Sequence, residues 1–297
     1  MSRSPTLFEC VPNFSEGRRV DVLDAIKKAA RVPGVRVLGL DSDPDHNRAV
    51  LTLMGERKPL AAAVFESMIT AAALIDLRLH HGTHPRIGAV DVVPFVPWQN
   101  ATMEEAKELS YEIGERAARE LQLPVFYYAE SALRPEHVNL ADVRRGEFEG
   151  LSDRLLHDPP DQGPSVPHPT AGAVAIGARH VLIAFNVYLD TPDLGAAKKI
   201  ARAVRGSSGG LVGVKALAMD IQSRGRVQVS MNLVDYRTTS LPRALEMVRR
   251  EAERLGFRVV ESEVVGLMPF AAVEDVAQYY LQMPDFDRKR VIELADD

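Results

Sequence analysis

The stretch RVQVSMNLVD, residues 226–235, determines which kind of sheet this chain can form. Its apolar and polar side chains alternate, with Val227, Val229, Met231 and Leu233 set against Gln228, Ser230 and Asn232. A period of two is typical of a strand that packs one face on a core and keeps the other polar, as antiparallel sheets usually do. The stretch therefore predicts an antiparallel strand with helices on its apolar side.

The polar side of this strand has two interpretations. It is either a sheet surface that faces solvent, which is the ordinary antiparallel arrangement, or the wall of a cleft that binds a polar ligand. Asn186, the single amide within the apolar run Val181–Leu189, favours the cleft. A buried amide needs hydrogen-bond partners, and a ligand can supply them.

The segments around this strand fit the same sheet. Residues 213–221 are expected to pair with 226–235 through the turn Ser223–Gly225, and residues 180–189 and 259–268 are expected to be further strands. One helix is predicted after a cap at Thr191-Pro192. A second is predicted over residues 240–255, where Gly256 occupies the usual glycine position after the last turn.

The first half of the chain also alternates between strands and helices. Strands are predicted at residues 7–13, 35–40, 49–54, 89–96 and 125–128, and helices at 18–32, at 58–77 and after the capping box Thr102–Glu105. Strand pairs joined by short turns favour antiparallel or mixed sheets over an all-parallel sheet. We expect an α/β fold of the α+β type, with two similar lobes that each carry helices on one face of a sheet.

Residues 157–172, HDPPDQGPSVPHPTAG, contain five prolines and two glycines. No helix or central strand can use this composition, so we interpret the segment as an extended connection between the lobes. The expected domains are residues 1–175 and 176–297. A chain of 297 residues is long enough for two domains at roughly 100–200 residues each.

Composition excludes several classes of protein. The net charge of −5 argues against a general nucleic-acid binder. No apolar run approaches the ~20 residues needed to cross a bilayer, and the N-terminus lacks the apolar core of a secretory signal. A single cysteine, Cys10, suits a reducing compartment. We expect a cytoplasmic protein whose partners are small molecules.

The stretch HHGTHPRIGAVD, residues 80–91, holds three of the eight histidines within five residues. One interpretation is a metal site, but Gly82 and Pro85 disfavour the helix that would put His80 and His84 on one face. A second is a solvated loop without function. A third is acid–base chemistry, with Arg86 positioning an anion and Asp91 orienting a ring nitrogen, because histidine exchanges protons near neutral pH.

The turn DSDPDHNR, residues 41–48, gathers three aspartates beside Asn47 and Arg48. Aspartate and asparagine are common turn formers, so one interpretation is a simple hairpin loop. The other is a carboxylate that faces a cationic amidine, with Arg48 nearby to bind a substrate carboxylate.

Together these segments resemble the formiminotransferase family, known both as stand-alone enzymes and as the N-terminal part of formiminotransferase–cyclodeaminase. The matching stretches of the first lobe are ECVPNFSEG at 9–17, Asn47-Arg48, Gly82 with His84-Pro85-Arg86, Gly88 and Asp91, and Gly163-Pro164-Ser165. Those of the second lobe are LIAFN at 182–186, SSGGL at 207–211, Val229-Ser230 with Asn232-Leu233, and Val265-Gly266-Leu267 with Pro269.

The resemblance implies two α/β lobes with their helices on the outer faces, their sheets facing each other across a ligand tunnel, and a homodimer. It implies tetrahydrofolate as a co-substrate, a catalytic acid–base at His84, and Asp41 as its helper. The implied folate contacts lie at Gly163, Pro164, Ser165, Val166, Pro167, Gly172, Asn186 and Asn232. The remaining substrate contacts are expected at Asn13, Asn47, Arg48, Arg86 and Asp91, and Lys215 and Arg226 are further candidates to hold substrate carboxylates.

The expected reaction moves the formimino group of N-formimino-L-glutamate to tetrahydrofolate, with no metal. We expect no cyclodeaminase activity in this polypeptide, although a separate cyclodeaminase is a possible partner. Three alternatives stay open at this point. They are formyl transfer on the same fold, a metal-dependent amidohydrolase that uses His80, His81 and His84, and a folate-binding protein without catalysis.

Overall fold

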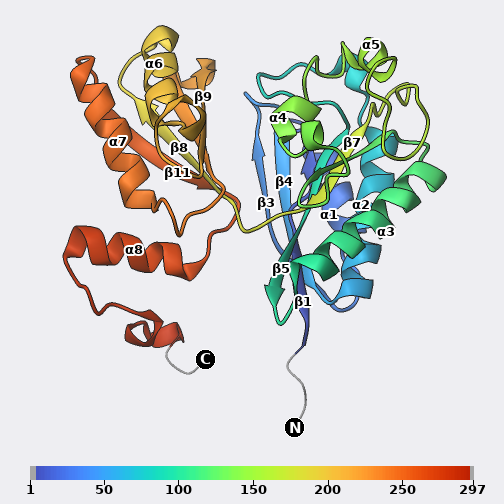
Figure 1. The fold of residues 1–297 in the computed structure, drawn as a ribbon, viewed down its shortest axis with the longest axis horizontal. Helices are drawn as coiled ribbons and strands as arrows, with labels where there is room; N and C mark the ends of the chain where they lie inside the picture. The colour runs from blue at the N-terminus through green and yellow to red at the C-terminus, as the bar shows by residue number, and fades with distance from the viewer. Residues whose placement is uncertain (1–4, 295–297) are drawn as a thin grey trace. The chain divides into compact units, whose positions relative to one another are not determined.

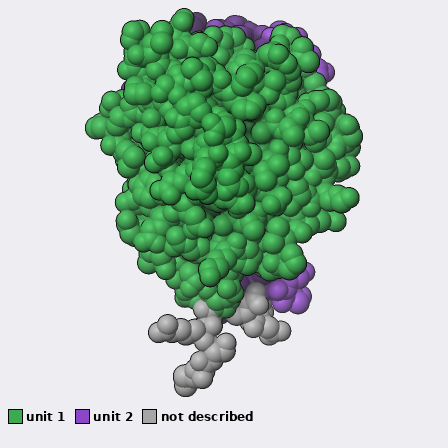
Figure 2. All heavy atoms as spheres, turned by 90° about the vertical axis from the view of Figure 1, so that its right-hand side faces the viewer, with its two compact units in different colours: residues 1–179 green, residues 180–297 purple. Residues whose placement is uncertain are grey.

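The computed structural model describes residues 5–294 and divides the chain into two compact units, Met1–Arg179 and His180–Asp297. Figure 1 shows the elements of each unit, and Figure 2 colours the two units separately. We describe each unit by itself.

Unit 1 is built on a seven-stranded mixed sheet. Its strands are β1 (Leu7–Cys10), β2 (Asn13–Phe14), β3 (Val35–Asp43), β4 (Arg48–Gly55), β5 (Val90–Gln99), β6 (Val125–Ala129) and β7 (Val174–Ala178). The order is β1-β4-β2-β5-β7-β6, with β3 paired to β4 and β1 also paired to β5. The β5–β7 and β6–β7 pairs are parallel and the others are antiparallel.

Three long helices cover one face of this sheet, as Figure 1 shows: α1 (Val20–Ala29), α2 (Arg57–Leu74) and α3 (Met103–Glu120). The main core lies between them and the sheet, and includes Phe8, Phe14, Leu51, Phe65 and Phe95. The predicted capping box at the start of α3 is confirmed, with Thr102 and Glu105 bonded reciprocally. The short helix η1 (Leu77–Leu79) follows α2.

The parallel end of the sheet is covered on its other face as well. There, η2 (Pro135–His137), α4 (Leu140–Val143) and α5 (Leu151–Leu155) lie between β6 and β7, and a second cluster packs Phe126 and Tyr128 against Val143 and Leu151. Parallel strands need long crossover connections, and these connections cover the sheet. The expectation of helices on one face of the sheet therefore holds only for the antiparallel part of unit 1. The parallel part is covered on both faces.

The prediction that residues 157–172 connect the two lobes was wrong. The segment contains no helix or named strand, as its prolines require, but it belongs to unit 1. Its end pairs with the main body through the Gly88–Gly172 bridge, and the chain then forms β7, a strand that the sequence analysis missed. Beyond β7, only Arg179–Leu182 precede the first strand of unit 2. The predicted boundary after residue 175 falls inside β7.

Unit 2 is built on a four-stranded antiparallel sheet, in the order β11-β8-β10-β9. Its strands are β8 (Ile183–Leu189), β9 (Val214–Ile221), β10 (Arg226–Leu233) and β11 (Val259–Val265). The helices α6 (Leu194–Val204) and α7 (Leu241–Arg254) pack against the face that carries Val227, Val229, Met231 and Leu233. The antiparallel strand and covered apolar side predicted from residues 226–235 are confirmed.

Two details of unit 2 differ from the expectation. Asp193 caps α6, accepting hydrogen bonds from the N–H groups of Gly195 and Ala196, whereas Thr191 accepts one from the N–H of Asp193. The last strand ends at Val265, because Gly266 has a φ of +75°, and α8 (Phe270–Leu281) follows it. The remaining short helices are η3 (Gly206–Ser208), η4 (Gln222–Arg224), η5 (Arg288–Arg290) and η6 (Ile292–Leu294). Within residues 5–294, no helix combines the length and apolarity needed to span a membrane.

Candidate active site

The histidine-rich loop of unit 1 lies against the hairpin between β3 and β4. Asn47, in the left-handed region with a φ of +49°, donates from Nδ2 to the carbonyl of His81 at 3.0 Å. The Asn47 carbonyl contacts Nε2 of His80 at 2.9 Å. A side chain at Gly82 would clash with the His46 carbonyl, so glycine is required there. Asn47 therefore fixes the loop that carries His84.

His84 is held through one side of its ring. Its Nδ1 lies 2.9 Å from Nη1 of Arg48 and 2.8 Å from the carbonyl oxygen of Pro85. Depending on the tautomer, Nδ1 accepts from the guanidinium or donates to the carbonyl. In either case Nδ1 is engaged by protein groups, and no hydrogen bond to Nε2 occurs among the described residues.

Asp91 does not contact His84 directly but acts on it through Arg48. The Asp91 side chain is fully buried, and its Oδ2 accepts hydrogen bonds from Arg48 Nη1 at 2.9 Å and Arg144 at 2.5 Å. Its Oδ1 accepts from the N–H of Ile87 at 2.9 Å. The expected orientation of a histidine ring by Asp91 is therefore indirect, with a guanidinium between the two groups.

Arg144, which follows α4, was missed by the sequence analysis. It lies in an ordinary polar segment, 53 residues from Asp91, and no motif marks it. A buried carboxylate requires cationic or hydrogen-bonding partners, but that rule does not say which arginine provides them. The Nε of Arg144 is buried and has no hydrogen-bond partner among the described residues. The same is true of Nε2 of His46, and the ring centroids of His46 and His84 are 6.2 Å apart.

The charges of this cluster favour a neutral imidazole. Burial lowers the pKa of His84 well below its usual value, and the guanidinium groups of Arg48 and Arg144 lower it further. Burial and the neighbouring Arg144 lower the pKa of Arg48 to about 10, so Arg48 stays charged at neutral pH. Burial alone would raise the pKa of Asp91, but Arg144, Arg48 and the Ile87 N–H outweigh it and keep the carboxylate ionised.

The second predicted catalytic residue, Asp41, lies on β3 and is exposed. It pairs with Val50 on β4, which in turn pairs with Asn13 on β2. Because side chains two residues apart share a sheet face, Asp41, Asn13 and Arg48 lie on the same face. Asn13 Oδ1 accepts from Arg48 Nη2 at 2.6 Å, so Asn13 helps to fix this guanidinium.

His80 and Arg86, which lie in the same loop as His84, are bound to other groups of the protein. His80 is buried, and both of its ring nitrogens have partners, because Nδ1 accepts from Arg86 Nε at 3.1 Å and Nε2 contacts the Asn47 carbonyl. Arg86, a predicted substrate contact, forms ion pairs with Glu147 at 2.8 Å and Glu149 at 2.5 Å. No group of three or more metal-ligating side chains occurs within the described chain. Both nitrogens of His80, one of the three histidines of the amidohydrolase alternative, are in contact with protein groups.

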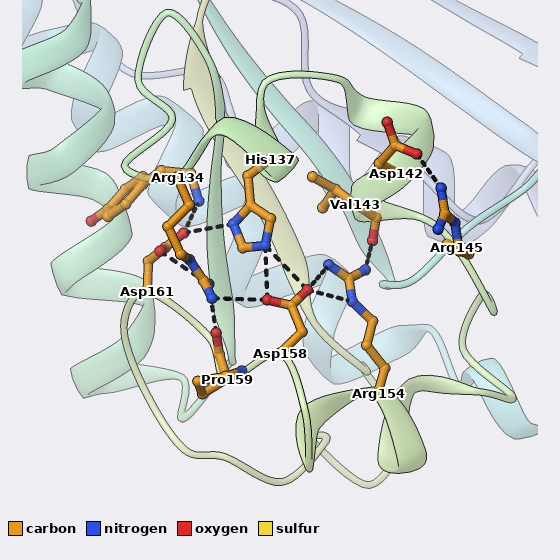
Figure 3. Close-up of polar contacts among 10 residues, drawn as sticks. Arg134, His137, Asp142, Val143, Arg145, Arg154, Asp158, Pro159 and Asp161 are labelled. Atoms are coloured by element: carbon orange, nitrogen blue, oxygen red, sulfur yellow. Dashed lines mark hydrogen bonds and ion pairs between the residues drawn. The ribbon is translucent and has the colours of Figure 1, made fainter.

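The predicted folate segment is anchored at its beginning by a partly buried network, shown in Figure 3. Asp158 accepts from His137 at 3.0 Å and pairs with Arg134 at 2.9 Å and with Arg154 at 2.5 Å. Asp161 pairs with Arg134 at 3.2 Å and accepts from the N–H of Tyr127 on β6 at 2.8 Å. These contacts fasten the residues just before Gly163 to the body of unit 1.

The end of the segment is a tight turn. His168 and Gly172 exchange both backbone hydrogen bonds, at 2.9 and 3.0 Å, and His168 Nδ1 accepts from the N–H of Ala171. Gly163 and Gly172 have φ values of +87° and +69°, a region that favours glycine. Between them lie Pro164, Ser165, Val166 and Pro167, and Val166 is 64% exposed. The segment is thus an ordered loop with accessible side chains.

In unit 2, the polar side of β10 is the face without helices. Asn186 on β8 is buried and donates to Glu263 on β11 at 3.1 Å, while Asn232 and Lys215 are exposed on the same face. Arg226 opens β10 and points to this side as well, by its register. Glu263 was not singled out from the sequence, because a lone glutamate in a predicted strand carries no distinctive pattern.

Comparisons with known proteins show the family of this chain. The profile described as "Formiminotransferase domain, N-terminal subdomain" matches residues 7–179, and the profile described as "Formiminotransferase domain" matches residues 184–295. The chain belongs to the formiminotransferase family, a family of transferase enzymes. The two matches meet where the structure divides the chain into its two units.

Three relatives show which members of this family the chain is similar to. The chain is 47% identical over 291 residues to the glutamate formimidoyltransferase of Streptococcus pyogenes serotype M1, covering 97% of both chains. It is 46% identical over 293 residues to the glutamate formimidoyltransferase of Thermoplasma acidophilum, covering 97% of this chain and 96% of that one. The formimidoyltransferase-cyclodeaminase of Rattus norvegicus is 40% identical over 284 residues, which cover 92% of this chain and 52% of that one.

Proposed function

We propose that this protein transfers the formimino group of N-formimino-L-glutamate to tetrahydrofolate, giving 5-formiminotetrahydrofolate and glutamate. Support comes from the two relatives named for this activity, which align over nearly their whole length. The observation that carries the proposal is the position of His84, whose Nδ1 is engaged by Arg48 and the Pro85 carbonyl while Nε2 remains for substrates.

The reaction needs one group that takes and returns a proton. The N5 atom of tetrahydrofolate attacks the formimino carbon, and the tetrahedral adduct carries the extra proton on N5. His84 accepts this proton and delivers it to the glutamate nitrogen. The bond between that nitrogen and the formimino carbon then breaks, and glutamate leaves as the amine. A single imidazole placed between the two nitrogens can serve both steps.

The electrostatics of the cluster suit this cycle. Because the pKa of His84 lies well below its usual value, the imidazole is neutral at neutral pH and can accept the proton. The nearby guanidinium groups disfavour the imidazolium that results, so the proton is readily passed on. Arg48 is itself held by Asp91 and Asn13, which keeps the ring-facing Nη1 in place.

We assign the formimino amidinium to Asp41. The group is cationic at neutral pH, and Asp41 presents an exposed carboxylate on the same sheet face as Arg48. The donor's own carboxylates would bind nearby basic side chains. Among the candidates, Arg86 is already paired with two glutamates, so it is the weakest of them.

Tetrahydrofolate is the proposed co-substrate, with contacts at Gly163–Gly172 and at Asn186 and Asn232. The ordered loop with an exposed Val166 and the exposed Asn232 support these contacts, whereas Asn186 is buried and bonded to Glu263. The ligand tunnel expected from the resemblance stays a prediction. The homodimer, the cytoplasmic location and a separate cyclodeaminase partner also stay predictions. Light scattering of the purified protein would test the homodimer.

A steady-state assay with separate donors tests the proposed activity. N-formimino-L-glutamate and N-formyl-L-glutamate are each offered with tetrahydrofolate, and the folate product is followed by its absorbance. We expect turnover with the formimino donor and little with the formyl donor, because only the former is cationic. Faster turnover with the formyl donor would favour formyl transfer, and binding of folate without turnover of either donor would contradict catalysis.

A further inference from the structure

The helix-free face of the unit 2 sheet carries a carboxylate held by three neutral side chains. Oε1 of Glu263 accepts hydrogen bonds from Tyr188 Oη at 2.8 Å, Asn186 Nδ2 at 3.1 Å and Gln228 Nε2 at 3.2 Å. Tyr188 and Asn186 lie on the neighbouring strand β8, whereas Gln228 lies one strand further, on β10. The Glu263 side chain therefore reaches across β8.

This arrangement leaves acceptors without donors. Within residues 5–294, every hydrogen bond to the Glu263 carboxylate falls on Oε1, and Glu263 forms no ion pair, since the nearby Arg224 pairs with Glu261 at 3.1 Å. Gln228 is fully buried, and its Oε1 has no partner among the described residues. A buried acceptor without a donor is costly, which applies to Gln228 Oε1, while the half-buried Glu263 keeps Oε2 open to a ligand that brings N–H groups.

The neighbouring side chains indicate the chemistry of the rest of that ligand. Tyr188, Met219 and Ile221 form a small apolar cluster, separate from the main core of the unit, on the same face as Glu263. Oε1 already accepts three hydrogen bonds, so Oε2 is the oxygen left for a ligand, and one carboxylate oxygen can accept two N–H donors from neighbouring nitrogens. The exposed side chain of Leu217, on the same face, fits the apolar plane of a ring. The shared chemistry is an N–C–N edge with a donor on each nitrogen.

We propose that Glu263, oriented by Asn186, Tyr188 and Gln228, binds the N3–H and 2-amino group of the pterin ring of the reduced folate. This inference rests on the proposed function and adds a specificity-determining residue to it. The formimino amidinium of the donor has the same N–C–N donor pattern. The guanidinium of Arg224, which lies over the Tyr188 ring at 4.7 Å, repels a second cation, so the site favours the neutral pterin over the amidinium.

Calorimetric binding of 5-formyltetrahydrofolate to the full-length protein tests the proposal without requiring turnover. Glu263→Gln keeps the acceptor that its three partners use but replaces the other oxygen with a donor. We expect folate affinity to fall by about 10- to 100-fold in this variant, the range for losing hydrogen bonds to a charged group. Glu261→Gln, an exposed site on the same strand, is the matched control and should bind folate like wild type.

A second measurement keeps the test independent of folding. Wild type should discriminate against a tetrahydrofolate analogue with a methyl group in place of the 2-amino group, and Glu263→Gln should lose most of this discrimination. Tyr188→Phe should show a smaller loss of affinity, and thermal unfolding of each variant verifies its fold. Wild-type folate affinity in a folded Glu263→Gln, or a change only in the KM for the formimino donor, would overturn the inference. A wild type that binds no folate and turns over neither donor would instead reject the proposed function.

Discussion

The guanidinium of Arg48 lies against the imidazole of His84, with Nη1 2.9 Å from Nδ1. Many catalytic histidines are backed by a carboxylate, which stabilises the imidazolium and raises the histidine pKa. In this protein the carboxylate of Asp91 contacts Arg48 and not the imidazole. The group in contact with the His84 ring is therefore the Arg48 cation. The arrangement keeps the ring neutral and oriented, as suits a base that must release its proton within the same turnover.

His84→Ala should lower turnover by roughly 10²- to 10⁴-fold, the usual contribution of a general acid–base. Folate affinity, measured by calorimetry, should stay within about twofold of wild type, since the proposed folate contacts lie elsewhere. His81→Ala is the control, because His81 is exposed in the same loop. Turnover of His84→Ala within a few-fold of wild type would remove His84 from the mechanism.

The pH profile of kcat/KM should report the neutral form of His84. Because burial, Arg48 and Arg144 lower the pKa of His84, its neutral form persists below the ordinary histidine range. The acidic limb of the profile should therefore have its midpoint below about 6.5. In Arg144→Gln one of the cations is gone, so the His84 pKa rises and the midpoint should move to higher pH. A midpoint that is the same in both proteins would contradict this electrostatic account.

Asp91→Asn should destabilise unit 1 rather than only slow catalysis. The substitution leaves two guanidinium groups, Arg48 and Arg144, without the buried carboxylate that both contact. Removing one member of a buried charged group typically costs about 3–5 kcal/mol. Urea unfolding would measure this loss, with Asp142→Asn, a partly exposed partner of Arg145, as the control. Equal unfolding midpoints for the two variants would mean that Asp91 is not needed for stability.

Asp41→Asn should reduce kcat/KM for the formimino donor by about 10-fold or more without changing the unfolding midpoint. Asp41 is exposed, and its proposed partner is the cationic substrate. Asp43→Asn offers the contrast, because Asp43 Oδ1 accepts from the N–H groups of Asp45 and His46 within the hairpin. If Asp41→Asn unfolds at lower urea concentration with unchanged kinetics, Asp41 is a structural residue of the hairpin.

The sequence by itself determined the features that depend on neighbouring residues. The alternation in residues 226–235 predicted an antiparallel strand with one covered face, and the structure pairs β10 antiparallel to both β8 and β9. The Thr102–Glu105 capping box and the stop at Gly256, whose φ is +83°, were likewise readable from a few adjacent residues. The family motifs pointed to His84 and Asp91, although they gave no distances.

Only the tertiary structure decided the features that depend on distant residues. It placed residues 157–172 inside unit 1, because β7 completes the parallel end of that sheet. It brought Arg144 to Asp91 across 53 residues and Glu263 to Asn186 across 77. Local periodicity reports which face of an element is apolar, but the partner of a buried charge is chosen by packing, and packing joins segments that no short pattern connects.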